Sequence, residues 1–202
     1  MDAVADAPSG GGPLASYVEI LASRGIDWGL IGPGEADRLW DRHVLNSLAI
    51  EGFVPTGASV LDVGSGAGLP GVPLALVRTD VTVTLLEPLL RRWRFLCGVV
   101  EELGLGDRVV AERGRAEDWT GSYDVVTCRA VAPLKTLVRW CGPLVAEGGR
   151  LIALKGQSAL DEVTDARADL RGRGWSAGIR EVVPPGGTEP TWVVEVGKGR
   201  FT

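Results

Sequence analysis

The chain contains the stretch Leu61-Asp62-Val63-Gly64-Ser65-Gly66-Ala67-Gly68-Leu69-Pro70-Gly71, in which an apolar run stops at a cluster of glycines and a helical pattern follows. Glycine carries no Cβ and tolerates positive φ, so such a turn can be tight and let a ligand approach the backbone. Pro70 suits the first turn of the helix, where its missing N–H costs nothing. The free N–H groups at the start of that helix favour a polar or anionic ligand. The stretch therefore predicts the first strand–turn–helix unit of a doubly wound, nucleotide-binding sheet.

Two kinds of ligand are compatible with this turn. Gly66 to Gly71 spells G-x-G-x-x-G, the fingerprint of NAD(P)-binding oxidoreductases. Gly64 to Gly68, with Asp62 two residues before the first glycine, instead resembles the S-adenosylmethionine (SAM) loop of Rossmann-like methyltransferases. An acid at Asp62 suits the methionyl ammonium of SAM and is badly placed beside a pyrophosphate. We therefore favour SAM as the cofactor, with the oxidoreductase and a glycine turn without a ligand as alternatives.

The composition indicates one ordinary globular domain. Of 202 residues, 45% are apolar, and no apolar run approaches the roughly 20 residues of a membrane span. The N-terminus has no basic stretch, so we expect neither a secretory signal nor a membrane partner. Three cysteines without a C-x-x-C pair predict a reduced, cytoplasmic protein, and we expect no metal site. The net charge of −5 argues against broad non-specific binding of nucleic acid, although the arginines are clustered.

We expect three parts: a disordered lead-in at residues 1–13, an N-terminal helical segment at 14–55 and a sheet domain at 56–202. Gly25 is expected to end the first helix, and a second helical pattern begins at Gly34. Apolar and β-branched runs predict seven strands, at residues 59–63, 81–86, 108–112, 123–128, 149–154, 176–183 and 191–196. Helical patterns lie between them, at residues 72–77, 89–103, 134–144 and 159–171. These elements use the whole chain and leave no second substrate region for a dehydrogenase.

Several polar residues fall at the ends of the predicted strands, where ligands bind in open α/β sheets. Glu87 follows the second strand, 19 residues beyond Gly68, and such an acid binds the two ribose hydroxyls of a nucleoside. Residues 114–118 follow the third strand and are expected to face the adenine. Arg129 and Lys155 follow the fourth and fifth strands, so we expect both at the edge where the chemistry occurs.

Five segments in order resemble one family. They are Arg42 to Leu48, against the family pattern R-H-x-L-D-S; Asp62 to Pro73; Arg92-x-Arg94-Phe95-Leu96; Cys128-Arg129-Ala130 with Pro133-Leu134; and Ala153-Leu154-Lys155-Gly156. Together they resemble the RsmG (GidB) family of bacterial methyltransferases, which modify N7 of a guanine in 16S ribosomal RNA. The resemblance implies a class I SAM-dependent methyltransferase fold, a seven-stranded α/β sheet with the last strand antiparallel, and S-adenosylhomocysteine as the product.

The resemblance also assigns residues and a partner. Gly64 and Leu69 are expected to contact SAM through their backbone, Ala116 and Glu117 to contact the adenine, and Arg129 to lie at the active-site edge. The implied substrate is 16S ribosomal RNA within the small subunit or its assembly intermediate, bound by a cytoplasmic protein expected to be a monomer. Asn46 stands where the family more usually has Asp, so a charge role at that position is in doubt here.

The chemistry of the implied acceptor needs few catalytic groups. N7 of guanine has an in-plane lone pair and no proton to remove, so the enzyme mainly has to position the reactants. Arg129 and Lys155 are the candidate catalytic residues; Arg129 could hold O6 or a phosphate, or support the SAM site. Arg42, His43 and Lys155 are candidate RNA contacts, with a structural role for His43 as an equal alternative. A small-molecule methyltransferase and a non-enzymatic RNA-binding module remain as alternatives.

Overall fold

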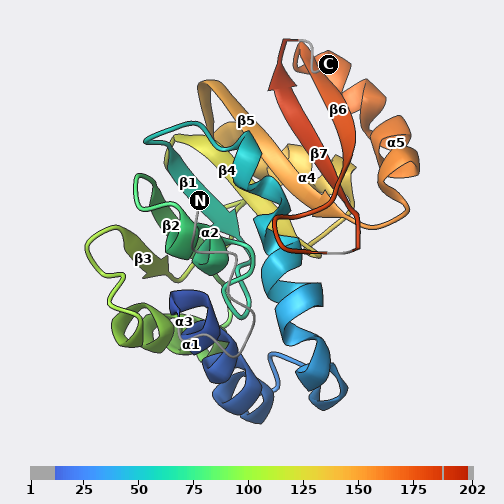
Figure 1. Cartoon of the computed structure of the whole chain (residues 1–202). Helices are drawn as coiled ribbons and strands as arrows, with labels where there is room; N and C mark the ends of the chain where they lie inside the picture. Colours follow the sequence, from blue (N-terminus) through green and yellow to red (C-terminus); the bar gives the residue numbers. More distant parts are fainter. Residues whose placement is uncertain (1–11, 188, 200–202) are drawn as a thin grey trace.

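The computed structural model of the chain describes residues 12–187 and 189–199, arranged as one seven-stranded sheet with helices on both faces (Figure 1). The strand order is β3-β2-β1-β4-β5-β7-β6. The strands are β1 (Ser59–Val63), β2 (Thr82–Leu86), β3 (Val109–Glu112), β4 (Tyr123–Arg129), β5 (Val145–Lys155), β6 (Trp175–Val182) and β7 (Thr191–Lys198). All seven predicted strands are present. Most of the expected disordered lead-in, residues 1–11, lies outside the described residues.

The sheet is mixed, and its connectivity fixes where a ligand can bind. Strands β1 to β5 pair in parallel, whereas β7 pairs antiparallel with both β5 and β6. The prediction of a last, antiparallel strand is confirmed. The chain moves outward from β1 to β3 and then returns to place β4 on the other side of β1. Such a reversal opens a crevice at the carboxyl ends of the two central strands.

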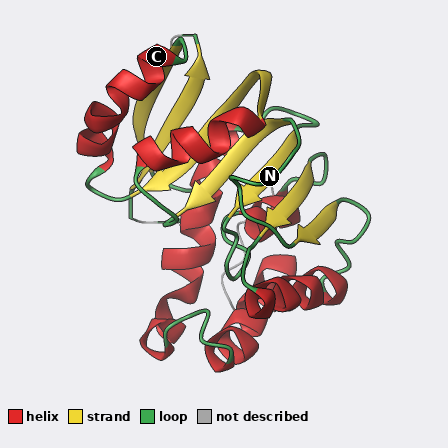
Figure 2. Ribbon diagram, turned by 180° about the vertical axis from the view of Figure 1, so that it is seen from behind, coloured by secondary structure: helices red, strands yellow, loops and turns green. Residues whose placement is uncertain are grey.

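Helices cover the two faces of the sheet differently. One face is covered by α2 (Gly71–Val77), α3 (Leu90–Glu102) and the N-terminal helical residues 13–53. The other face carries α4 (Leu134–Cys141) and α5 (Ala159–Gly172), which lie in front of the sheet in Figure 2. The buried apolar side chains accordingly form two clusters, one on each face.

The N-terminal segment is helical almost throughout. It contains α1 (Pro13–Ile20), two π-helical stretches, η1 (Leu21–Gly25) and η3 (Leu39–Leu45), and two 3₁₀ stretches, η2 (Pro33–Arg38) and η4 (Leu48–Phe53). The expectation that Gly25 ends the first helix is wrong, because the helix continues to residue 27. Gly25 instead lets Leu21 and Ile31 approach the backbone, and Gly29, with φ of 63°, adopts the left-handed conformation that ends the helix.

This segment shares its hydrophobic core with the sheet. Tyr17, Leu45 and Ile50 are fully buried in the same cluster as Ile152 of β5 and Val193 of β7. Buried residues of α2 and α3 belong to the same cluster, so the helices of the segment are stabilised by tertiary packing rather than by their own propensity.

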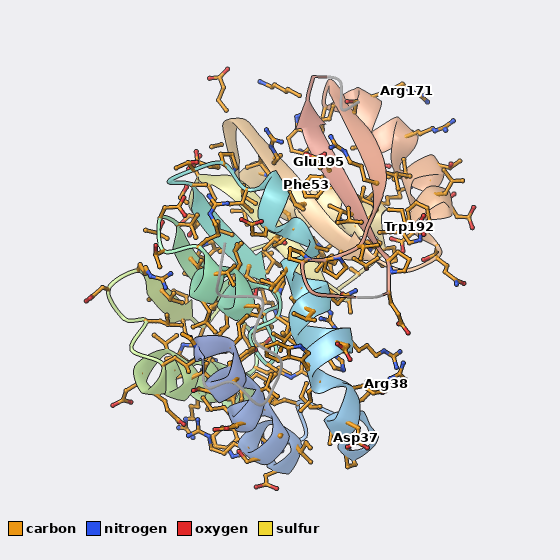
Figure 3. The ribbon with its side chains drawn as sticks, viewed as in Figure 1. Asp37, Arg38, Phe53, Arg171, Trp192 and Glu195 are labelled. Atoms are coloured by element: carbon orange, nitrogen blue, oxygen red, sulfur yellow. The ribbon has the colours of Figure 1, made fainter. Side chains whose placement is uncertain are left out.

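A polar contact attaches the end of the N-terminal segment to the far strands. Glu195 of β7 is buried between Arg150 and Arg180, whose guanidinium nitrogens lie 3.0 and 3.2 Å from its carboxylate. The guanidinium carbon of Arg180 lies 5.2 Å from the ring centre of Phe53 in η4. Figure 3 shows Phe53 beside Glu195. Phe53 is partly buried and packs against the core cluster that includes Val193 of β7.

Two features bear on the sequence-based expectations about compartment and metals. No helix among residues 12–187 and 189–199 is long and apolar enough to cross a membrane. Within the same residues, no group of three or more histidine, cysteine or acidic side chains is arranged to hold a metal ion. The three cysteines are free thiols, and Cys128 and Cys141 are buried.

Core packing against α3 predicts a large effect of truncation there. Leu96 is fully buried on α3, so Leu96→Ala should lower the free energy of unfolding by about 2–5 kcal/mol. Leu160 on α5 is 64% exposed, and Leu160→Ala should change the free energy of unfolding by less than about 0.5 kcal/mol. Urea titration of both variants measures the difference, and equal losses would contradict the assignment of the core.

Candidate functional site

Two neighbouring clefts open at the carboxyl edge of the central strands. The first cleft, about 470 Å³, is lined mainly by the glycine turn, Glu87 to Leu89 and Arg129 to Val131. The second cleft, about 750 Å³, is lined by the residues after β4 and β5, by Arg42 and Asn46, and by Glu189 to Thr191. Arg129, Ala130 and Val131 line both clefts and form the wall that they share.

The glycine turn leaves room for a ligand at one position. Gly64 and Gly66 have φ of 67° and 60°, in the region that disfavours side chains. A Cβ at Gly64 would lie 2.8 Å from a methyl group of Val131, so this glycine lets the turn pack against the shared wall. A Cβ at Gly66 would meet only the carbonyl oxygen of Gly64, at 3.8 Å. A side chain at Gly66 would therefore enter open space, and Gly64, Gly66 and Leu69 all line the first cleft.

Glu87 holds the turn and also lines the first cleft. Its side chain is almost fully buried, and its two carboxylate oxygens accept hydrogen bonds from the N–H of Gly66 and of Leu89, both at 3.0 Å. Each oxygen keeps a further lone pair. The carboxylate can therefore accept hydroxyl donors from a ligand in the cleft while it fixes the backbone on either side.

Asp62 does not lie where the sequence-based interpretation placed it. It is fully buried and does not line the first cleft; its Oδ2 accepts the N–H of Gly71 at 3.0 Å. The first N–H of α2, which we expected to be free for a ligand, is therefore occupied. Burial raises the pKa of Asp62 to about 7, against the opposing effect of the bonds from Gly71 and Ser65. Asp62 positions the turn from behind instead of meeting an ammonium group.

Tyr17 is a residue that sequence reasoning missed. Its hydroxyl donates to the carbonyl oxygen of Ala67 at 2.8 Å, entirely within the core. Burial, and secondly the nearby charge of Asp62, raise the pKa of Tyr17 well above its ordinary value. In the sequence, Tyr17 is only one more residue beside a helical apolar stripe, and nothing local indicates a contact 50 residues away.

Arg129 ties the N-terminal segment to the end of β4. Its Nη1 donates to the carbonyl oxygen of His43 at 2.8 Å and to Ser47 Oγ at 3.0 Å. Its Nη2 donates to Nδ1 of His43 at 2.7 Å and to the carbonyl oxygen of Arg42 at 3.4 Å. These four bonds use all four terminal N–H groups of the guanidinium. In this structure the terminal nitrogens of Arg129 bind the N-terminal segment, which agrees with the expected alternative that Arg129 supports the site rather than contacting a phosphate.

His43 is the partner that this arrangement orients. Because its Nδ1 accepts from Arg129, its Nε2 carries the proton and donates to Glu35 Oε2 at 2.9 Å. Burial lowers the pKa of His43 in spite of the Glu35 carboxylate, so the ring is neutral at pH 7. His43 lines the first cleft, but both of its nitrogens are engaged within the chain.

Lys155 is a strut for the loop after β4. Its side chain is 8% exposed, with Nζ 2.6 Å from the carbonyl oxygen of Ala132 and 2.7 Å from Glu162 Oε2. The same Glu162 oxygen accepts the N–H of Leu134 at 2.7 Å. Between Arg129 and this strut, Ala130 adopts φ of 54°, which is unfavourable for a residue with a side chain and is maintained by its surroundings. The expectation that Lys155 meets RNA phosphate needs correction, since its charge already faces a carboxylate.

The remaining predicted residues fall in different places. Arg42 has a side chain that is 50% exposed, lines the second cleft and makes one 3.4 Å contact with Glu35. Ala116 is buried in the core and Glu117 is exposed, and neither lines the first cleft. The turn at residues 115–118 directs the Ala116 methyl inward, and the adenine contacts of Ala116 and Glu117 stay a prediction. The prediction also missed Ile31, Leu89 and Arg92, which do line the first cleft.

Comparison with known proteins connects this geometry to a family. The model of the GidB family, described as rRNA small subunit methyltransferase G, matches residues 12–176. The chain belongs to the GidB family. Relatives named "Ribosomal RNA small subunit methyltransferase G" include that of Kineococcus radiotolerans, 52% identical over 189 residues (92% of this chain, 74% of the relative). That of Streptomyces coelicolor is 50% identical over 186 residues (91% and 72%).

Solved structures at lower identity agree with this family's fold. M. jannaschii TYW2 in complex with AdoMet superposes with a TM-score of 0.58 at 16% identity, covering 76% of this chain and 73% of that one. Ribosomal protein L11 methylase from Lactobacillus delbrueckii subsp. bulgaricus gives 0.59 at 14% identity, covering 77% and 78%. The GidB-family chain therefore has the class I SAM-dependent methyltransferase fold, and the resemblance stated from its sequence is confirmed. The family match and the fold favour the methyltransferase over the oxidoreductase alternative.

The strut role of Lys155 in this GidB-family protein predicts a loss of stability. Lys155→Met should lower the free energy of unfolding by about 1–3 kcal/mol, because Glu162 and the Ala132 carbonyl lose their shared donor. The control is Lys135→Met, which removes an exposed pair with Asp169 at 3.6 Å and should cost less than about 1 kcal/mol. Chemical denaturation of both variants tests this, and equal stabilities would show that Lys155 is not a strut.

The buried carboxyl of Asp62 predicts a pH dependence of stability. Its folded pKa, about 7, exceeds the ordinary 3.8, so the folded state retains a proton that the unfolded state releases. Stability from this group is complete below the unfolded pKa and is lost as the pH rises, at about 1.4 kcal/mol per pH unit between pH 4 and 7. Asp62→Asn keeps an acceptor for Gly71 and removes the titration. Unfolding of the variant and the native protein across this range should show Asp62→Asn gaining relative stability as the pH rises; a constant difference would contradict the assignment.

Proposed function

We propose that this protein transfers a methyl group from SAM to N7 of a guanine in 16S ribosomal RNA. The observation that carries the proposal is the shared wall of Arg129 to Val131, which sets a cofactor-type glycine cleft directly beside a second, larger cleft. Membership of the GidB family, with relatives named for the small-subunit ribosomal RNA, supports the choice of acceptor.

The residues of the first cleft fit SAM. Its volume of about 470 Å³ lies within the range of small-molecule sites, roughly 300–1,000 Å³. Gly66 presents a bare backbone to the open cleft, and Glu87 has lone pairs free for the two ribose hydroxyls. Leu89 and Ile31 supply apolar surface for a base. When bound, SAM supplies an electrophilic methyl group.

The chain's contribution to the reaction is positioning. N7 of guanine attacks with its own lone pair, so the protein has no proton to remove at that atom. This agrees with His43, the one histidine of the chain, having both ring nitrogens engaged by Glu35 and Arg129. Arg129 and Lys155 act by holding the turn at Ala130 from both sides, and this fixes the distance between the clefts. Correct placement of two reactants can supply about 7–11 kcal/mol of a barrier.

The proposed partner is the small ribosomal subunit or its assembly intermediate, met in the cytoplasm by a monomeric enzyme. With a net charge of −5, the protein must confine its attraction for phosphate to a local surface. Arg38 and Arg42 are both exposed near the second cleft and border one small hollow, so we propose them as phosphate contacts.

The proposed activity has a direct test. Labelled SAM and purified protein are incubated with small ribosomal subunits from cells lacking this enzyme, and the modified base is mapped. We expect one methyl group, on N7 of a single guanine of 16S RNA. Failure to label the RNA would contradict the proposed function.

A variant at Gly66 should separate cofactor binding from folding. Gly66→Val places a side chain in the first cleft and should abolish SAM binding by calorimetry. Gly104→Val is the matched control, because Gly104 has nearly the same φ, 62° against 60°, with no neighbour within 4 Å and no place in the first cleft. Both should lose about 1–2 kcal/mol of stability to backbone strain, but only Gly66→Val should lose SAM. Native SAM affinity in Gly66→Val would reject the cofactor site.

A further inference from the structure

The second cleft contains two carboxylates with different surroundings. Glu162 is fully engaged: it meets Lys155 at 2.7 Å, accepts the N–H of Leu134 at 2.7 Å and accepts Ser158 Oγ at 3.0 Å. Glu189 is exposed and, among residues 12–187 and 189–199, forms no hydrogen bond or ion pair. Its carboxylate is therefore available to a molecule that enters this cleft.

The lining residues place Glu189 on the second cleft and not on the first. Glu189 lines the second cleft and a small hollow of about 140 Å³ shared with Arg42 and Asn46, but it does not line the first cleft. Its backbone is restrained, because the following Pro190 favours an extended conformation for the residue before it. The N–H of Gly187 also donates to the carbonyl oxygen of Pro184 at 2.9 Å, which closes the turn before it. The carboxylate of Glu189 is therefore available to the second cleft and not to the first.

A free carboxylate in a cleft for RNA is unexpected if phosphate is the only contact. Its charge repels phosphate, whereas a carboxylate readily accepts hydrogen bonds from base N–H groups. Guanine offers two adjacent donors, N1–H and the 2-amino group, on the side of the purine opposite N7. When N7 faces the shared wall, these donors point away from that wall, into the cleft that Glu189 also lines.

We propose that Glu189 is a specificity-determining residue that accepts hydrogen bonds from N1–H and the 2-amino group of the acceptor guanine. This inference rests on the proposed function and adds to it the reason that guanine is chosen. Adenine also has an N7 lone pair, but it presents an unprotonated N1 to the carboxylate and is rejected. Asn46, on the same hollow, is neutral and does not supply a charge for this contact.

The test uses Glu189→Gln with a control of equal charge change. Glu181→Gln alters an exposed glutamate on β6 that lines neither cleft. The substrates are small-subunit RNAs carrying guanine, inosine or adenine at the mapped position. Glu189→Gln should lower kcat/KM for guanine by about 10- to 100-fold, the loss of charge-assisted bonds, with SAM affinity unchanged. The native protein should show a kcat/KM about tenfold higher for guanine than for inosine, which lacks the 2-amino group. In Glu189→Gln, the ratio of kcat/KM for guanine to that for inosine should be smaller, and so should the ratio for guanine to adenine.

The direction of the change separates this role from simple electrostatics. Removing a negative charge from an RNA-binding surface raises phosphate affinity, so Glu181→Gln should leave kcat/KM unchanged or slightly higher. Native or increased kcat/KM for Glu189→Gln, with native discrimination among the three bases, would overturn the role of Glu189 while leaving the proposed function intact. No methyl transfer by the native protein to any of these RNAs would overturn both.

Discussion

The guanidinium of Arg129 holds together the two parts of the molecule that form the site. It extends from the end of β4 and donates to the backbone of Arg42 and His43 and to the side chains of His43 and Ser47. Without these bonds, the half-buried guanidinium would lose four acceptors in a region of low dielectric, which is costly. The interaction places His43 on the first cleft and Arg42 on the second, so one side chain sets the positions of both walls.

The buried polar side chains beneath the glycine turn all hold backbone groups in place. Asp62, Tyr17 and Glu87 are all buried, and each binds a backbone group of the turn or of the helix that follows it. The turn is therefore shaped by the protein before any ligand binds, which reduces the ordering cost of binding. Asp62 Oδ1 and Thr127 Oγ1, at paired positions of β1 and β4, are buried without a partner among the described residues. Burying these two oxygens without hydrogen-bond partners costs free energy of folding. Such under-satisfied polar groups are common at functional sites.

The RNA site proposed for the second cleft has to operate in a protein with a net charge of −5. Lys155 and Glu162 neutralise one another there, Arg42 is half-exposed with one 3.4 Å contact to Glu35, and Glu189 has no partner among the described residues. An exposed arginine suits phosphate and a free carboxylate suits a base edge, so the two together can distinguish a nucleotide from a simple anion. Recognition on this surface depends on local chemistry, because the overall field of the protein repels the polyanion.

The sequence by itself determined the sheet, the glycine turn and the family. The seven strands, the glycine turn and the strand-end position of Glu87 were predictable, because alternation, glycine clustering and strand-end acids depend on neighbours within a few residues. The antiparallel last strand was predicted from the resemblance to the GidB family. Only the tertiary structure decided what Tyr17, Asp62, Arg129 and Lys155 do. Their partners are 50, 9, 86 and 23 residues away, at Ala67, Gly71, His43 and Ala132. A charged or hydroxyl side chain at a strand end or helix face has the same local signature whether it meets a ligand or a distant backbone group. The difference lies in which groups the folded chain leaves without a partner, and this is fixed only when the whole core has assembled.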